Sequence, residues 1–312
     1  MNDILLADIG ATNSRFAVLG PDGRPEHIIK LRGDAVPNLE AGIERYIKES
    51  GIRPRAAVLA IAAPIDGDLI AMTNRPWRFK LSDLAARFGW KWVRCLNDFE
   101  AAAWSLPRLV ETDIRSLGPL VRNDAAPKVI FGPGTGLGVA ALIRSGGAWQ
   151  VLSSEGGHVT FGPASDAEEQ AFARMRSDCG DVSVERILSG PGLERLHRAL
   201  HPGARNTAAD IVTAAHVGDG AAVETVAFFV RLLGRYAGDL ALIFKAHGGI
   251  YLGGGVARRI ATLLDADAFR AAFEQHPPYA DLLRGIPTTL ITLDEPGLLG
   301  CAAVAETMPV IV

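Results

Sequence analysis

The sequence has only three cysteines among its 312 residues. Cys95, Cys179 and Cys301 stand far apart and form no CxxC pair, so neither a zinc knuckle nor a disulfide framework is indicated. We therefore expect no metal site made of protein side chains. This use of cysteine is typical of a reducing compartment, and we expect the protein to be cytoplasmic.

Basic clusters and long apolar runs are also lacking. The formal net charge is −3, and the absence of any basic run argues against binding to nucleic acid or to an anionic membrane. The most apolar stretch, residues 223–244, is interrupted by Arg231, Arg235 and Asp239, so it lacks the roughly 20 apolar residues of a membrane span. We expect it to be a core helix. Asp3 stands where a signal peptide would carry positive charge, and we expect no such peptide.

Two common phosphate-binding motifs are missing. No GxxxxGK[ST] segment occurs, which excludes a P-loop. The stretch "GPGTGLGVA" at residues 132–140 departs from the dinucleotide fingerprint GxGxxG, because Val139 stands at the sixth position. It also continues into an apolar, strand-like stretch, whereas the fingerprint opens a helix.

A repeated strand–turn–strand pattern is present. Residues 4–29, "ILLADIGATNSRFAVLGPDGRPEHII", and residues 128–152, "KVIFGPGTGLGVAALIRSGGAWQVL", each place a Gly–Thr or Gly–Ala–Thr turn between two apolar strands and continue through a tight turn to a third strand. The repeat predicts two similar α/β lobes with a cleft between them. Residues 107–128 contain prolines and no clear period, and we expect a domain boundary there.

The glycine turns admit two interpretations. They could serve only as tight hairpins, or their backbone N–H groups and threonine hydroxyls could bind phosphate oxygens. A third glycine cluster, Gly253 to Gly255, follows the strand-like "GIYL" and precedes a helix predicted to begin near Val256. It is either a tight connection or a place where a ligand approaches the backbone.

The segment "LNDFEAAAWSL" at residues 96–106 lies where a strand ends and an alanine-rich helix begins. Asn97 and Glu100 have the spacing of a capping box, which does not use Asp98. Asp98 is then either a first-turn acid that interacts with the helix dipole or a functional carboxylate.

Taken together, these segments resemble the bacterial glucokinases of the actin-like ATPase and sugar kinase superfamily. The resemblance covers nearly the whole chain, through "ADIGATNSR", "LNDFEAAAW", "GPGTGLGVA", "EGGHVTF", "VSVERILSGPGL", "LGGGV" and "EPGLLG". The clustered cysteines of the zinc motif in the related repressor and kinase family are absent, which places the chain outside that branch.

The resemblance implies a duplicated actin-like, ribonuclease H-like fold of two lobes with the ligand cleft between them. The small α/β domain would comprise residues 1–108 and 298–312, and the larger α+β domain residues 109–297. The implied reaction is ATP-dependent phosphorylation of D-glucose at the 6-hydroxyl, and the family suggests a homodimer. A kinase for another hexose and a catalytically silent sugar sensor on the same fold are the alternatives.

Site residues follow from the same motifs. Asp98 would be the catalytic base, and we expect the helix N-terminus to keep its carboxylate ionised with a low pKa. The implied sugar ligands are Asn74, Asn97, Asp98, Glu155, His158 and Glu185, with Glu185 expected to precede a helix that begins at Arg186. The implied ATP-binding residues are Ala7, Asp8, Ile9, Gly10, Ala11, Thr12, Asn13, Gly134, Thr135, Gly136, Gly254 and Gly255.

The first phosphate motif departs from the family pattern Asp-x-Gly-Gly-Thr, because Ala11 stands at the second glycine position. Alanine is compatible with the turn if φ at this residue is negative. Mg²⁺ would arrive with ATP and contact the protein mostly through water, with Asp8 as the nearest expected carboxylate.

Overall fold

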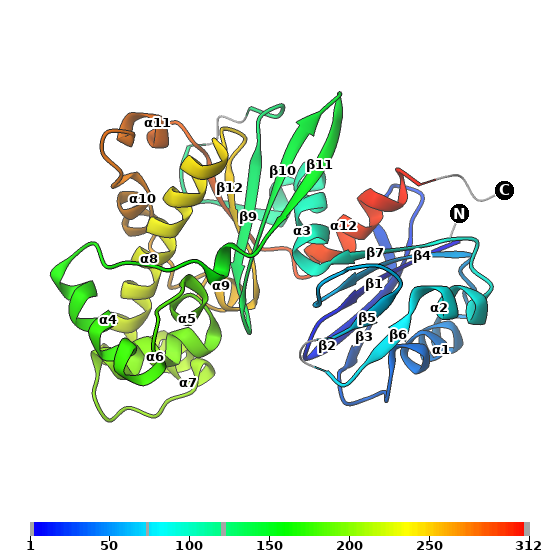
Figure 1. Ribbon diagram of the computed structural model, residues 1–312, viewed down its shortest axis with the longest axis horizontal. Helices are drawn as coiled ribbons and strands as arrows, with labels where there is room; N and C mark the ends of the chain where they lie inside the picture. The colour runs from blue at the N-terminus through cyan, green and yellow to red at the C-terminus, as the bar shows by residue number, and fades with distance from the viewer. Residues whose placement is uncertain (1–2, 73–74, 120–122, 309–312) are drawn as a thin grey trace. The chain divides into compact units, whose positions relative to one another are not determined.

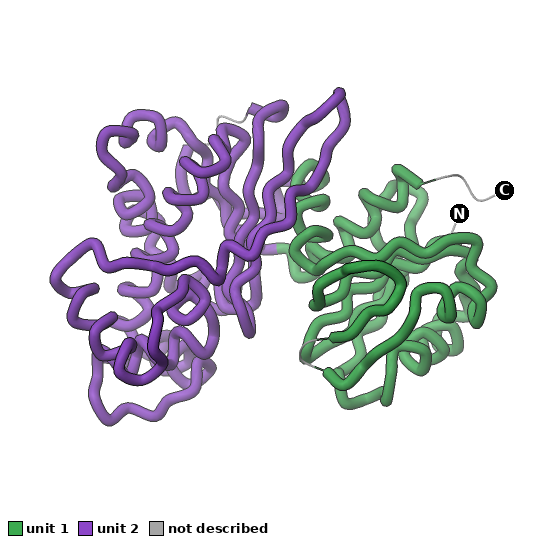
Figure 2. The backbone as a smooth tube through the Cα atoms, in the orientation of Figure 1, with its two compact units in different colours: residues 1–109, 293–312 green, residues 110–292 purple. Residues whose placement is uncertain are grey.

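The computed structural model describes residues 3–72, 75–119 and 123–308, and the chain divides into two compact units. Unit 1 comprises residues 1–109 and 293–312, and unit 2 comprises residues 110–292 (Figure 2). The chain therefore leaves unit 1 after its first third and returns to it for the C-terminal helix.

Unit 1 is a five-stranded mixed sheet with helices on both faces. Its sheet has the order β3-β2-β1-β4-β7; β1 pairs antiparallel with β2 and parallel with β4. Its elements are β1 (Ile4–Ile9), β2 (Asn13–Leu19), β3 (Pro25–Arg32), α1 (Leu39–Ser50), β4 (Ala56–Ile61), β5 (Leu69–Ala71), β6 (Arg78–Lys80), α2 (Leu81–Phe88), β7 (Val93–Asn97), α3 (Asp98–Ser105), η1 (Leu106–Arg108) and α12 (Pro296–Ala305).

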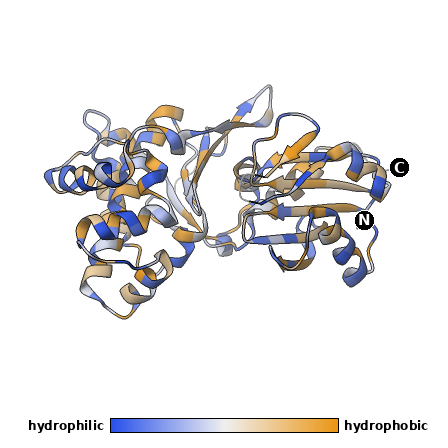
Figure 3. Ribbon diagram, turned by 60° about the horizontal axis from the view of Figure 1, so that its bottom comes forward, coloured by the Kyte–Doolittle hydropathy of each residue, from blue (hydrophilic) through white to orange (hydrophobic). Residues whose placement is uncertain are grey.

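The central strands of unit 1 are apolar because both faces of the sheet are covered. All six residues of β4 are buried, as expected for a parallel strand between two helical layers. One face packs against α1 and α2, and the other against α3 and α12 (Figures 1 and 3).

Helices α3 and α12 lie in direct backbone contact. A Cβ atom on Gly300 would lie 1.6 Å from the carbonyl oxygen of Ala101, so only glycine fits there. The C-terminal helix thus fixes the helix that begins with Asp98.

Unit 2 has a six-stranded sheet and eight α-helices among its described residues. The sheet order is β11-β10-β9-β12-β13-β8. The elements are η2 (Glu111–Asp113), β8 (Ile114–Ser116), β9 (Lys128–Pro133), β10 (Leu137–Ser145), β11 (Ala148–Ser154), η3 (Gly156–His158), α4 (Asp166–Cys179), α5 (Val184–Ile187), α6 (Gly190–Leu200), α7 (Ala208–His216), α8 (Gly220–Phe244), β12 (Ile250–Leu252), α9 (Gly255–Arg259), α10 (Ala266–Glu274), α11 (Ala280–Arg284) and β13 (Thr288–Ile291).

The two sheets repeat one topology, which confirms the predicted duplication. In unit 2, β9 pairs antiparallel with β10 and parallel with β12, as β1 pairs with β2 and β4 in unit 1. β12 continues to β13 in parallel, as β4 continues to β7. Strand β8, antiparallel to β13, is an addition at the edge of the unit 2 sheet.

The apolar stretch 223–244 lies within α8, a helix of 25 residues whose middle portion is buried in the unit 2 core, as predicted. Among the described residues, no helix is long and apolar enough to cross a bilayer.

Two short features were not anticipated. The described residues 106–119 contain the 3₁₀ turns η1 and η2 and the strand β8, where irregular chain was expected. Strands β5 and β6 pair antiparallel, with Leu69 opposite Lys80 and Ala71 opposite Arg78. Three-residue strands show no detectable hydrophobic period, so the sequence pattern could not reveal them.

Candidate active site

The predicted helix start at Asp98 is confirmed, with its capping box. The Asn97 side chain accepts from Phe99 N at 2.9 Å and Glu100 N at 3.4 Å, and Glu100 Oε2 accepts from Asn97 N at 3.4 Å. The Asn97 amide nitrogen also donates to Ala63 O at 3.2 Å. Both ends of this side chain are therefore used within unit 1, which favours its capping role over its predicted role in binding sugar.

The expected low pKa of Asp98 is wrong. Burial, reinforced by the negative charge of Asp8, raises the pKa of Asp98 to about 6. The hydrogen bond from Phe99 N at 3.0 Å and the Asn97 side chain act in the opposite direction. The residue as a whole is half-buried, and desolvation of the carboxylate exceeds the effect of the helix N-terminus.

Asp8, the one acidic residue of β1 (Ile4–Ile9), is largely buried and paired. Arg15 Nη1 lies 3.2 Å from Asp8 Oδ2, and Arg15 Nε lies 3.5 Å from Glu295 Oε1. A Cβ atom on Gly297 would lie 3.0 Å from the Asp8 carboxyl carbon, so glycine lets α12 approach this carboxylate. Sequence reasoning missed Arg15 and Glu295, although "EPGLLG" pointed to this region.

The first phosphate turn connects β1 to β2. Gly10 N donates to Asn13 O at 3.0 Å and Gly33 N donates to Thr12 O at 2.7 Å. Neither the Ala11 nor the Thr12 amide donates to another residue that the structure describes. Among the described non-glycine residues, only His27 and Lys245 have positive φ. The φ angle of Ala11 is therefore negative, and alanine is compatible with this turn.

The second phosphate turn, Gly134 to Gly136, connects β9 to β10. Gly134 N donates to Gly136 O at 2.8 Å, and Gly190 N donates to Gly134 O at 2.8 Å. Within the described chain, the amides of Thr135 and Gly136 have no protein acceptor. Each turn therefore offers two backbone donors to an anion.

Three predicted sugar ligands converge in unit 2. His158 Nδ1 lies 3.3 Å from Glu155 Oε2, and His158 Nε2 lies 3.8 Å from Glu185 Oε1. Glu155 precedes the 3₁₀ turn η3 as its N-cap residue, and His158 is the last residue of that turn. The glycine Gly157 packs against Leu137, because a Cβ there would lie 2.4 Å from Leu137 O. Their side chains are 85% and 64% exposed, so they are accessible to a polyol.

Glu185 also contacts the second phosphate turn. Its Oε2 accepts from Leu137 N at 2.8 Å, and a Cβ atom on Gly136 would lie 2.4 Å from this oxygen. The expectation that Glu185 precedes a continuous helix is wrong. It lies inside the short α5, and Ser189 then caps the separate helix α6 by accepting from Gly192 N.

The third glycine cluster packs against the end of β9. Gly254 has φ 86°, and a Cβ atom on it would lie 2.5 Å from Pro133 O. No side chain caps α9, which begins at Gly255. The backbone of the glycine cluster thus lies directly against the residue that precedes the second phosphate turn.

Asn74 lies outside the described residues. Ala7, Asp8, Ile9 and Asn13 lie on β1 and β2 around the first turn, as the sequence repeat implies. Within the described part of the chain, no three acidic, histidine or cysteine side chains gather as metal ligands.

Comparisons with known proteins agree on one family. The glucokinase family model matches residues 5–308. A bifunctional protein glk of Burkholderia thailandensis is 40% identical over 307 residues, covering 96% of this chain and 48% of that protein. The chain thus spans about half the length of this relative.

A glucokinase of Brucella suis biovar 1 is 39% identical over 312 residues, covering 97% of this chain and 91% of that protein. Among solved structures, a glucokinase from an Antarctic psychrotroph superposes with a TM-score of 0.89 at 30% identity, covering 99% of this chain and 100% of that chain. The duplicated sheets described above are those of the actin-like fold.

Proposed function

Because the chain belongs to the glucokinase family, we propose that it transfers the γ-phosphoryl group of ATP to the 6-hydroxyl of D-glucose. The products are glucose 6-phosphate and ADP. The observation that carries this proposal is Asp98, a carboxylate at a strand-to-helix junction with its pKa raised to about 6.

In this reaction the 6-hydroxyl oxygen attacks the γ-phosphorus, and the bond from that phosphorus to the β,γ-bridging oxygen breaks. Asp98 accepts the hydroxyl proton. A base with a pKa near 6 takes a proton more readily than an ordinary aspartate and is still ionised at neutral pH. Phosphoryl transfer otherwise depends on positioning and on neutralising phosphate charge.

The two turns supply donors for that charge. The free amides of Ala11 and Thr12 and those of Thr135 and Gly136 suit phosphate oxygens. Mg²⁺ bound to the nucleotide would add positive charge at the transferring group, and Asp8, close enough to influence the Asp98 pKa, suits a contact through its water shell.

We propose Glu155, His158 and Glu185 of unit 2, and Asp98 and Asn74 of unit 1, as sugar ligands, whereas Asn97 serves as the cap of α3. This proposal treats residues 1–109 with 293–312 and residues 110–292 as the two functional lobes.

The test is an ADP-release assay of the purified protein with ATP and each of glucose, mannose, fructose and N-acetylglucosamine. We expect kcat/KM to be highest for glucose. A higher value for another sugar would make the chain a kinase for that hexose. Absence of ADP release with all four, in protein that still binds glucose, would favour the silent sensor.

We further propose a cytoplasmic homodimer, as the family resemblance implies. Light scattering should then give a mass twice the 33.1 kDa of one chain. A mass of one chain at micromolar concentration would contradict the dimer.

A further inference from the structure

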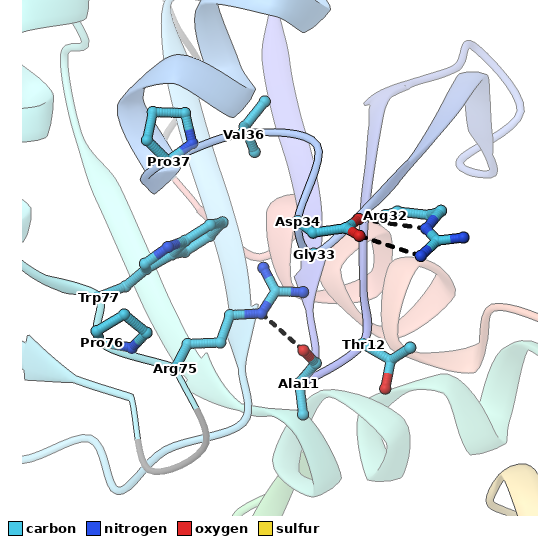
Figure 4. Close-up of a pocket in the computed structure, with 10 residues that line it drawn as sticks. All are labelled: Ala11, Thr12, Arg32, Gly33, Asp34, Val36, Pro37, Arg75, Pro76 and Trp77. Atoms are coloured by element: carbon cyan, nitrogen blue, oxygen red, sulfur yellow. Dashed lines mark hydrogen bonds and ion pairs between the residues drawn. The ribbon is translucent and has the colours of Figure 1, made fainter.

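Unit 1 contains a pocket of about 540 Å³ beside the first phosphate turn (Figure 4). Its walls are the turn residues Ala11 and Thr12, the loop of residues 32–37, and the segment Arg75–Trp77. The last segment is remote from the turn in sequence, and none of its residues was assigned a role above.

Arg75 connects these walls. Its Nε donates to Ala11 O at 2.8 Å, and its Nη1 donates to Ser14 Oγ at 3.0 Å. Ser14 is fully buried, so water does not compete for this hydrogen bond. One guanidinium group therefore holds the phosphate turn and the first residues of β2 together.

Two neighbours fix the guanidinium itself. Its carbon lies 4.5 Å from the centroid of the Trp77 ring, which is 5% exposed. On another side Gly33 leaves room for it, because a Cβ there would lie 2.5 Å from Arg75 Nη2. The orientation of Arg75 is thus set by packing as well as by hydrogen bonds.

The charge of Arg75 has no acidic partner among the described residues, and its Nη2 is buried without a hydrogen-bond acceptor. Burial accordingly lowers the pKa of Arg75. Arg32, which lines the same pocket, differs in both respects: it is 80% exposed and paired with Asp34 at 3.0 Å. Of these two arginines, the one beside the phosphate turn, Arg75, is therefore the one whose positive charge no described acidic side chain neutralises.

The acceptor atom explains how this charge acts. Ala11 O belongs to the same peptide group as the Thr12 amide, whose N–H is not used by any described residue. A charged donor on the carbonyl oxygen polarises the peptide group and makes its N–H a stronger donor. It also prevents the peptide group from rotating.

We propose that Arg75 is a positioning residue for ATP, which orients and polarises the Ala11–Thr12 peptide so that the Thr12 amide binds a phosphate oxygen. Arg75 acts through this peptide and does not itself touch the substrate. The inference rests on the proposed function only in naming ATP as the anion at the turn.

The experiment compares Arg75→Ala with wild type in steady-state kinetics and in titration calorimetry with ATP in the absence of sugar. We expect the ATP KM and the ATP Kd to rise about tenfold or more, as for loss of a charged hydrogen bond. The glucose KM should change less than about twofold. Arg75→Lys keeps the charge but not the two-point contact. Its ATP KM and Kd should therefore lie between those of wild type and those of Arg75→Ala.

Arg32→Ala is the matched control, because it removes a cation from the same pocket that does not contact the turn. It should leave the ATP KM and Kd within about twofold of wild type. Low millimolar guanidinium should partly restore ATP affinity to Arg75→Ala, with equal sodium chloride as the reference. The nearly unchanged glucose KM, and not this rescue, separates a role at the phosphate turn from a general loss of structure.

Unchanged ATP affinity in Arg75→Ala would overturn the proposal, as would equal losses in ATP and glucose KM or an equal effect of Arg32→Ala. If wild type shows no turnover with any sugar, the proposed function fails separately. The calorimetric comparison of ATP Kd then still decides the role of Arg75.

Discussion

At the scale of single residues, Asp98 illustrates two opposed influences on one carboxylate. The N-terminus of α3 stabilises its charge through the Phe99 amide, while burial and Asp8 destabilise it. Burial dominates, and the pKa rises to about 6. The sequence predicted the position of Asp98 at the helix start, because caps are local. It could not predict the pKa, since Asp8 and the atoms that desolvate Asp98 come from distant segments.

The raised pKa predicts the pH dependence of activity. Only the ionised carboxylate can accept the hydroxyl proton, so kcat/KM for glucose should fall about tenfold per pH unit below pH 6. Initial rates at subsaturating glucose between pH 4.5 and 8 measure this. A profile that stays flat down to pH 5 would contradict the role of Asp98 as the base.

Asp98→Asn should separate catalysis from stability. We expect kcat to fall by about 10²–10⁴, because the general base is lost. Above pH 6 the native state holds Asp98 ionised at a cost, because its folded pKa of about 6 exceeds the reference 3.8. The variant should therefore raise the free energy of unfolding by about 1–3 kcal/mol at pH 8. This gain should disappear as the pH falls from 6 to 4, where wild-type Asp98 becomes protonated.

Asp83→Asn is the control for Asp98→Asn, since Asp83 is an exposed acid in the first turn of α2. Its loss should reduce stability by about 0.3–1 kcal/mol at pH 8 and leave kcat unchanged. Thermal melts at pH 4, 6 and 8 beside kcat values test both variants. A stability loss in Asp98→Asn with kcat preserved would make Asp98 a structural acid like Asp83.

At the scale of elements, the short helix α5 joins two motifs that the sequence presents separately. Glu185 faces His158 through one oxygen and holds Leu137 N, at the end of the second phosphate turn, through the other. The sequence identified both motifs but not this bond, because the partners are 48 residues apart. Nor did it show that the helix breaks at Leu188, where Ser189 begins a new one.

Substitutions of Glu185 can distinguish the roles of its two carboxylate oxygens. Glu185→Gln keeps an acceptor for Leu137 N, so we expect a higher glucose KM with the ATP KM nearly unchanged. Glu185→Ala leaves that amide unpaired, at a cost of about 1–3 kcal/mol, and should raise both KM values. His158→Ala, which has no bond to the turn, should raise the glucose KM alone. An ATP KM that stays at the wild-type value in Glu185→Ala would refute the link to the turn.

The contact between α3 and α12 gives a second prediction for elements. Gly300→Ala would place a Cβ 1.6 Å from Ala101 O, so the helices must separate. We expect a loss of about 1–3 kcal/mol in unfolding free energy, with a lower kcat because α3 carries Asp98. Gly220→Ala, at the first position of α8 where a Cβ meets nothing within 4 Å, is the control and should be neutral or stabilising. A wild-type melting temperature in Gly300→Ala would contradict this close packing.

At the scale of the whole molecule, the duplication was readable from the sequence because each copy keeps the same local unit of strand, glycine turn and strand. The first strand of each copy also pairs in parallel with a later strand, β1 with β4 and β9 with β12. The edge strand β8 breaks the symmetry and was missed, since its three residues gain their conformation from β13. Arg75 was missed for a similar reason, because its partner Ala11 is 64 residues away.

The last prediction concerns the number of glucose molecules that one chain binds. If Asp98 and His158 are both glucose ligands, as proposed, calorimetry should find one glucose per chain, and both Asp98→Ala and His158→Ala should weaken its binding. Each removes a hydrogen bond worth about 1–3 kcal/mol in a water-excluded site, so the glucose Kd should rise about fivefold or more. Asp83→Asn in unit 1 and His247→Ala in unit 2 remove comparable exposed groups and should leave the Kd unchanged. Two glucose molecules per chain would contradict a single sugar site, and a wild-type Kd in either Asp98→Ala or His158→Ala would remove that residue from the sugar ligands.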